Sequence, residues 1–202
     1  TCALPICNPA IILADGVIGQ MMEKVVLPEQ RTRLTDEEVI ARCPWATTGR
    51  THHRTPNIIT SLELDPAEME KRNIHLQKKY AEIEENEVRF EELHCEDAEY
   101  LIVAFGSCAR IAQKAMEMAR EEGIKVGLLR PITLWPFPSK AIAARAAQVK
   151  GILTVELNAG QMVEDVRLAV ECKVPVEHFG RLGGIVPDPD EVITALKEKL
   201  IK

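Results

Sequence analysis

Aromatic residues and positive charge are both in short supply in this chain. It has two Trp, two Tyr and four Phe among 202 residues. Side chains this few and scattered cannot build the stacking platform that single-stranded nucleic acids need. The 25 basic residues are outnumbered by 31 acidic ones, which gives a net charge of −6, so a phosphate backbone would not be attracted. We therefore exclude nucleic acid as the main partner.

Long hydrophobic runs are missing as well. The apolar runs at residues 11–14 and 101–105 fall far short of the roughly 20 residues that a membrane-spanning helix requires. Asn8, Pro9 and Asp15 interrupt the apolar stretch near the start, which also has no basic flank, so the pattern of a secretory signal is absent. We expect a cytoplasmic protein without membrane contact.

The cysteines follow no metal-binding spacing. No two of them form a C-x-x-C pair, and no four cluster along the sequence, which excludes a zinc or iron–sulfur framework in this chain. We expect reduced thiols and no metal site, so that any iron–sulfur cluster would be bound by another chain. The six are Cys2, Cys7, Cys43, Cys95, Cys108 and Cys172.

The start of the chain has the pattern expected of a fragment of a longer protein. Residues 1–6 have no helix cap and no helical period, and they match the translation of the end of a common sequencing-library adapter, which suggests the hypothesis that they are not natural protein. The continuous apolar run at 9–15 ends in Asp15-Gly16. It predicts a strand buried on both faces that closes at a turn.

A linker arm and a long helix are expected over residues 27–96. Residues 27–60 show little period and predict a linker that wraps a partner or neighbour. Asp65-Pro66-Ala67-Glu68 is typical of a helix start, with Asp65 as the cap and Glu68 able to complete a capping box. The helix carries one narrow apolar seam, which suits either a surface and a partner or a core. The seam consists of Met69, Leu76, Tyr80, Ile83 and Phe90.

From residue 98 onward, short apolar runs alternate with helical stretches. Strand followed by helix four times over predicts an α/β fold, a mainly parallel open sheet with helices on both faces. The expected strands are 100–105, 125–129, 152–156 and 176–179, and the expected helices are 109–122, 139–149, 162–170 and 189–200.

Ligands and partners of such a sheet meet the loops at the carboxyl ends of its strands. Residues 106–108, Gly-Ser-Cys, could present an anion site with an activated thiolate, or simply a Ser helix cap and a half-buried thiol. The glycines of 180–184 suit backbone turning better than a phosphate loop. His52-His53 suit a solvated arm better than a metal site, and Asp15-Gly16 is rejected as a magnesium–diphosphate motif.

The loop at 130–138 is the most informative of these segments. Its three prolines restrict the backbone, so Trp135 and Phe137 can be held outward at little entropic cost, and Arg130 adds a planar donor group. Rigid aromatic residues with Arg are typical interface anchors. An aromatic lid folded onto its own helices is the alternative.

Several segments together resemble the alpha subunit of the 2-oxoacid:ferredoxin oxidoreductases. The resemblance runs from about residue 8 to the end of the chain and is nearest to the 2-oxoisovalerate (3-methyl-2-oxobutanoate) branch, then to the 2-oxoglutarate branch. The segments are IILAD (11–15), GQMME (19–23), EENEV (84–88), VGLLRPITLWPFP (126–138), VELNAGQMVED (155–165) and GRLGGIV (180–186).

The resemblance implies a domain plan and a reaction. Residues 1–26 would be the end of a thiamine-type pyrimidine-binding domain, 27–96 the linker arm and long helix, and 97–202 a transketolase-C-terminal-like α/β domain. The family decarboxylates a 2-oxoacid on thiamine diphosphate, passes electrons through [4Fe-4S] clusters to ferredoxin, and transfers the acyl group to coenzyme A. The diphosphate, Mg and the clusters would be held by beta and gamma/delta-type partner subunits.

No catalytic residue is carried over, because the catalytic Glu of the family falls outside this sequence. The predicted role of this chain is structural and subunit-assembling, with a subunit interface at Arg130, Trp135, Phe137, Asn158 and Gln161. A non-catalytic α/β interaction module is the alternative. A flavodoxin-like flavin carrier is a third reading, but Gly-Ser-Cys-Ala at 106–109 is a poor phosphate loop.

Overall fold

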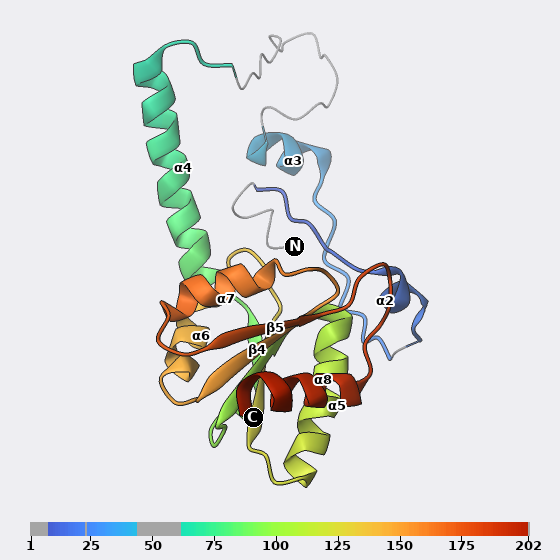
Figure 1. Ribbon diagram of the computed structural model, residues 1–202. Helices are drawn as coiled ribbons and strands as arrows, with labels where there is room; N and C mark the ends of the chain where they lie inside the picture. Colours follow the sequence, from blue (N-terminus) through green and yellow to red (C-terminus); the bar gives the residue numbers. More distant parts are fainter. Residues whose placement is uncertain (1–7, 23, 44–61, 202) are drawn as a thin grey trace. The chain divides into compact units, whose positions relative to one another are not determined.

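The computed structural model describes residues 8–22, 24–43 and 62–201 (Figure 1). The chain divides into two compact units, Met22–Lys78 and the combination of Thr1–Met21 with Lys79–Lys202. Residues 1–6, to which the adapter hypothesis applies, lie outside the described residues, and so does the pair His52-His53. The second of these units holds the sheet and every candidate site residue.

The sheet has five strands: β1 (Phe90–Leu93), β2 (Tyr100–Ala104), β3 (Val126–Pro131), β4 (Gly151–Glu156) and β5 (Val176–Gly180). Their order across the sheet is β1-β3-β2-β4-β5. The four strands from β2 to β5 run parallel, while β1 pairs antiparallel with β3 at one edge. The predicted α/β architecture with a mainly parallel sheet is thereby confirmed, and β1 is an edge strand that the sequence pattern did not indicate.

Side chains of the central strands alternate between two cores. Ile102 and Ala104 of β2 pack with α5 (Gly106–Glu121) and α8 (Pro189–Leu196). Leu101 and Val103 belong to the other core, with α6 (Ser139–Ala146) and α7 (Met162–Val170). The period-2 geometry of a strand requires this alternation, and it explains why both faces of the sheet carry helices (Figure 1).

Most helices agree with their predicted positions. α7 has the predicted bounds, and α8 continues as a short π-helical turn, η1 (Lys197–Ile201). The helix expected at 109–122 begins earlier, at Gly106, with Phe105 as its N-cap. Ser107 is therefore not the cap. Its hydroxyl lies inside the first turn and donates to Asp15 instead.

The long helix α4 (Pro66–Asn86) starts where predicted. Asp65 Oδ1 accepts from the backbone N–H groups of Ala67 and Glu68, which satisfies donors that the first helical turn leaves free. The Glu68 carboxylate pairs with Lys71 at 2.6 Å. Phe90 was wrongly placed on the seam, because the helix ends at Asn86 and Phe90 pairs with Pro131 in the sheet.

One prediction near the start is wrong. Residues 9–15 form no strand, and Ile11, Ile12 and Leu13 are exposed. A strand needs a hydrogen-bonded neighbour, and the described residues place none beside this segment. Within the predicted linker at 27–60 the structure describes a short helix, α3 (Asp36–Arg42), fixed by a capping box between Thr35 and Glu38. A helix this short has too few apolar residues to show a period.

The edge strand β1 is held by an arginine from a neighbouring helix. Arg145 of α6 donates to Glu92 through Nε at 2.9 Å and Nη2 at 2.6 Å, and both side chains are largely shielded. This paired geometry is the strong form of a carboxylate–guanidinium contact. The hydrogen bond from Arg145 lowers the pKa of Glu92, so the pair stays charged at neutral pH.

Candidate functional site

The loops that follow β2, β3, β4 and β5 lie at one edge of the sheet, because the four strands are parallel and adjacent. In open α/β sheets this carboxyl edge is where ligands and partners bind. The loops run from β2 to α5, from β3 to α6, from β4 to α7 and from β5 to α8. The candidate site is therefore built on these loops.

A buried carboxylate organises the loop between β4 and α7. Glu156 is 1% exposed and accepts three backbone N–H groups, from Gln161 at 3.1 Å, Met162 at 2.8 Å and Val163 at 3.0 Å. The N-cap residue Gln161 offers α7 no side-chain cap. The last residue of the preceding strand thus caps the helix, and its negative charge is placed at the favourable end of the helix dipole.

His178 of β5 lies beside this carboxylate. Its Nδ1 is 3.4 Å from Glu156 Oε1 and 3.3 Å from the Thr154 hydroxyl. The backbone of the two loops approaches closely here, since a Cβ added to Gly180 would lie 2.2 Å from the carbonyl oxygen of Asn158. Glu156 fixes the end of the 157–161 loop through its hydrogen bonds, and Gly180, which has no side chain, lets the loop lie close against β5.

A pocket of about 190 Å³ opens between the 131–138 loop and the start of α7. Its walls are mostly apolar, and two carboxylates and one amide supply its polar groups. The lining residues are Phe105, Leu134, Phe137, Glu156, Gln161, Met162 and Asp165.

The structure separates the five predicted interface residues. Phe137 and Gln161 line the pocket together, whereas Trp135 is 55% exposed and meets Tyr80 edge-on at 5.8 Å. Arg130 is bound to Glu91 at 2.9 Å, and Asn158 Oδ1 accepts from Gly160 N. All five lie on the β3–α6 loop, on the β4–α7 loop or at the end of β3.

Phe137 differs from the expectation that both aromatic residues of this loop point outward. It packs against the core beneath α6 and α7, as the alternative of an aromatic lid requires, while Trp135 remains outside.

Glu156 and Asp165 are site residues that the sequence reading did not select. A signal for Glu156 does exist, since a carboxylate that ends a strand shortly before an uncapped helix is a candidate cap.

The loop at 106–108 does not form an anion site. Asp15 Oδ2 accepts from the Ser107 hydroxyl at 2.6 Å, and this hydrogen bond lowers the pKa of Asp15. A charged carboxylate held at this position would repel a phosphate. Burial raises the pKa of the Cys108 thiol to about 11, with Glu156 and Asp15 adding to the effect. Of the two alternatives for Cys108, the buried thiol is supported over the activated thiolate, and the side chain is more deeply buried than predicted.

Thiol labelling tests this environment. At pH 8 an ordinary thiol with a pKa of about 8.5 is roughly one-quarter ionised, whereas a pKa of about 11 leaves roughly one molecule in a thousand ionised. We expect iodoacetamide to modify exposed Cys172 at least about 100-fold faster than Cys108, as followed by peptide mass spectrometry. In 6 M guanidinium the two rates should converge, and comparable rates in the native protein would contradict the burial of Cys108.

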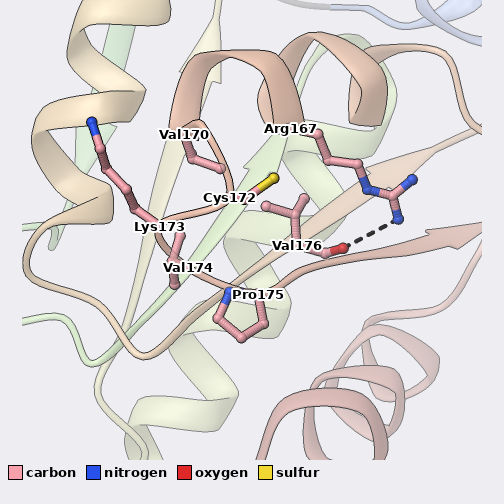
Figure 2. Close-up of a pocket in the computed structure, with 7 residues that line it drawn as sticks. All are labelled: Arg167, Val170, Cys172, Lys173, Val174, Pro175 and Val176. Atoms are coloured by element: carbon pink, nitrogen blue, oxygen red, sulfur yellow. Dashed lines mark hydrogen bonds between the residues drawn. The ribbon is translucent and has the colours of Figure 1, made fainter.

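A larger pocket of about 390 Å³ lies elsewhere (Figure 2). It is built by the end of α7 and the residues that lead into β5, and in it Arg167 Nη2 donates to the carbonyl oxygen of Val176 at 3.2 Å. Because it lies at the amino end of β5, it is remote from the carboxyl-edge loops. Its lining residues are Arg167, Val170, Cys172, Lys173, Val174, Pro175 and Val176.

The donor set needed for a metal ion or an iron–sulfur cluster does not come together in the described part of the chain. No three His, Cys, Asp or Glu side chains gather there. Its four cysteines, Cys43, Cys95, Cys108 and Cys172, are free thiols. These residues therefore do not fit Mg, a diphosphate-bound metal or a cluster. In the same part of the chain, no helix has the length and apolar character needed to cross a membrane.

The chain is similar to a known protein family and to several characterised subunits. The family model for the pyruvate:ferredoxin oxidoreductase core domain II matches residues 98–192. A ketoisovalerate oxidoreductase subunit VorB from Methanothermobacter marburgensis is 44% identical over 191 residues, which is 95% of this chain and 52% of the relative. A 2-oxoglutarate synthase subunit KorA from Archaeoglobus fulgidus is 31% identical over 184 residues, 90% of this chain and 51% of the relative.

A solved structure agrees with these sequence relatives. The 2-oxoglutarate:ferredoxin oxidoreductase from Magnetococcus marinus, with 2-oxoglutarate, coenzyme A and succinyl-CoA bound, matches with a TM-score of 0.60 and 26% identity, over 67% of this chain and 24% of that chain. The chain spans about half the length of the curated relatives it matches. Residues 98–192 thus match the model of core domain II, and the chain is similar over nearly its whole length to subunits of 2-oxoacid oxidoreductases.

Proposed function

We propose that this chain is part of the alpha subunit of a cytoplasmic, thiamine-diphosphate-dependent 2-oxoacid:ferredoxin oxidoreductase. The reaction would be the oxidative decarboxylation of a 2-oxoacid to an acyl-CoA with reduction of ferredoxin. The observation that carries this proposal is the 44% identity to a ketoisovalerate oxidoreductase subunit along nearly the whole chain, against 31% to a 2-oxoglutarate synthase subunit. This difference favours 2-oxoisovalerate as the substrate and leaves 2-oxoglutarate as the second candidate.

Other subunits would supply the redox and metal groups. Since the described residues offer no cluster of ligands, we assign thiamine diphosphate with Mg to a site shared with or held by the beta subunit, and the [4Fe-4S] clusters to the beta or gamma/delta-type subunits. Coenzyme A as the acyl acceptor is supported by the related structure that contains it. When bound, thiamine diphosphate would supply the decarboxylation chemistry.

This chain would mainly position and join subunits. Its organisation would be the end of the pyrimidine-binding domain at 1–26, a linker arm and helix at 27–96, and the α/β domain at 97–202. Trp135 supports the assembling role, since a Trp left 55% exposed on a proline-restricted loop has the properties of an interface anchor. Arg130, Phe137, Asn158 and Gln161 would complete the interface.

Viologen reduction by the reconstituted complex tests the proposed reaction. The full-length chain would be co-expressed with its genomic neighbours and assayed with coenzyme A and, in turn, 2-oxoisovalerate, 2-oxoglutarate and pyruvate. We expect coenzyme-A-dependent reduction that is highest with 2-oxoisovalerate and is lost when this chain is omitted. A stable complex loaded with clusters that reduces viologen with none of the acids would refute the reaction and favour the non-catalytic interaction module.

A further inference from the structure

The pocket beside α7 has an apolar floor that is open to solvent. Phe137 belongs to the core beneath it, and Met162 is almost fully buried. Leu134, which is 37% exposed, lies at the pocket and is continuous in sequence with Trp135. Exposed apolar and aromatic residues around a recess are typical of a protein-docking surface.

The two carboxylates of the pocket are in very different states. Glu156 is buried and already accepts three backbone N–H groups, so its charge is compensated by α7. Asp165 is exposed, and its carboxylate forms no hydrogen bond or ion pair with any residue that the structure describes. Of the two carboxylates, only that of Asp165 can therefore still form hydrogen bonds or an ion pair with another molecule.

The lining contains no positive charge. Among the described residues it consists of five uncharged side chains and two carboxylates, with no lysine, arginine or histidine. A recess with an apolar floor and an unpaired acid at its edge complements a long side chain that has an apolar stem and a cationic end. Lysine and arginine are the two residues with that form, and arginine also stacks on aromatic faces.

We propose that this pocket receives a lysine or arginine side chain of a partner subunit, with Asp165 as its counter-ion and Phe137 and Leu134 around its stem. The inference rests on the proposed function, because it takes the carboxyl edge as a subunit interface. It goes further by naming the kind of residue that the partner contributes and the one carboxylate that recognises it. Complementary charges of this kind fix register and select the partner more than they add affinity.

Charge reversal at Asp165 tests the proposal in the full-length chain. Glu164 is the matched control, since it lies next to Asp165 in the first turn of α7, is exposed and does not line the pocket. Asp165→Lys and Glu164→Lys change the net charge and the charge near the helix terminus by the same amount. We expect Asp165→Lys to raise the Kd for the partner subunits at least about 10-fold and Glu164→Lys to leave it nearly unchanged.

Two further variants complete the experiment. Asp165→Asn should weaken assembly less than Asp165→Lys, because it removes the attraction without adding repulsion, and Trp135→Ala should weaken assembly through the loss of apolar contact alone. Kd would be measured by biolayer interferometry at 50 and 300 mM NaCl. The difference between wild type and Asp165→Asn should shrink at the higher salt concentration, since added salt screens exposed charge pairs.

The outcomes separate this proposal from the reaction itself. Equal effects of Asp165→Lys and Glu164→Lys would overturn the cation pocket, even if viologen reduction and the Trp135→Ala effect were as expected. A homodimer of the purified chain that Asp165→Lys dissociates, seen by sedimentation velocity, would also overturn it, because the occupant would then be a second copy. Loss of viologen reduction in every variant and in the wild type would refute the proposed function instead.

Discussion

Replacement of Glu156 by Ala is expected to destabilise the α/β domain by about 4 kcal/mol. A hydrogen bond to a charged group contributes about 1.5–3 kcal/mol, and a buried donor left without a partner costs about 1–3 kcal/mol. Glu156 accepts three such bonds at 2.8–3.1 Å while being 1% exposed, so its removal leaves the N-terminus of α7 uncapped. For a chain of this length the melting temperature should fall by about 10 °C.

Thermal unfolding followed by circular dichroism would measure this effect, with Glu164→Gln as the control. Glu164 lies in the same helical turn but is exposed, so its substitution should change stability by no more than about 0.5 kcal/mol. Glu156→Gln should fall between the two, because the amide oxygen still accepts while the amide nitrogen opposes backbone N–H groups. A Glu156→Ala protein that melts with the wild type would show that water or another group caps α7.

Substitution of Gly180 by Ala is the second change with a large expected effect. The added Cβ would lie 2.2 Å from the carbonyl oxygen of Asn158 and 2.7 Å from His178 Nε2. A backbone oxygen cannot rotate away as a side chain can, so the loop at 157–161 must move. We expect a loss of about 3 kcal/mol, at the upper end for overpacking, and faster amide hydrogen exchange in that loop.

Gly19→Ala is the matched control for Gly180→Ala. Nothing lies within 4 Å of a Cβ at Gly19, which is in α2 (Gly16–Gln20), and alanine is a better helix former than glycine. This variant should be neutral or slightly stabilising. Unchanged melting and hydrogen exchange in Gly180→Ala would mean that the close approach between β5 and the 157–161 loop does not persist in solution.

The strands and helices from residue 98 onward could be predicted because their patterns are local. The apolar runs of β2, β3, β4 and β5 predict buried strands, and α7 has the predicted bounds. The glycines that follow β5 do turn the backbone, with φ of +67° at Gly183 and +85° at Gly184. Strand–helix alternation then leaves few possible topologies, because crossover connections between parallel strands are right-handed.

The errors occur where a neighbour decides the structure. Phe90 continues the seven-residue apolar repeat of α4, but pairing with Pro131 of β3 draws it into the sheet. Residues 9–15 have the composition of a buried strand, yet an apolar run forms a strand only where another strand offers hydrogen-bonding groups. In both cases the local pattern is compatible with two structures, and the position of another segment selects one of them.

The candidate site divides in the same way. The sequence predicted that the loops at 130–138 and 157–161 would meet at the carboxyl edge and that Trp135 would be exposed. The sequence holds a signal for Glu156 as a cap and left open whether Phe137 points inward, but it could not decide either of these or the unpaired state of Asp165. Each depends on which backbone donors or apolar surfaces come within bonding distance after the loops fold back on the sheet.

The sequence by itself determined the acidic balance of this protein, its alternating strands and helices, and the motifs that make it similar to 2-oxoacid oxidoreductase subunits. The tertiary structure alone decided that the Glu156 carboxylate caps α7 and that the Asp165 carboxylate stays unpaired and open to a partner. The physical reason is that hydrogen-bond satisfaction acts over a few ångströms. Glu156 and Asp165 stand nine positions apart, and only the folded chain buries one and leaves the other exposed.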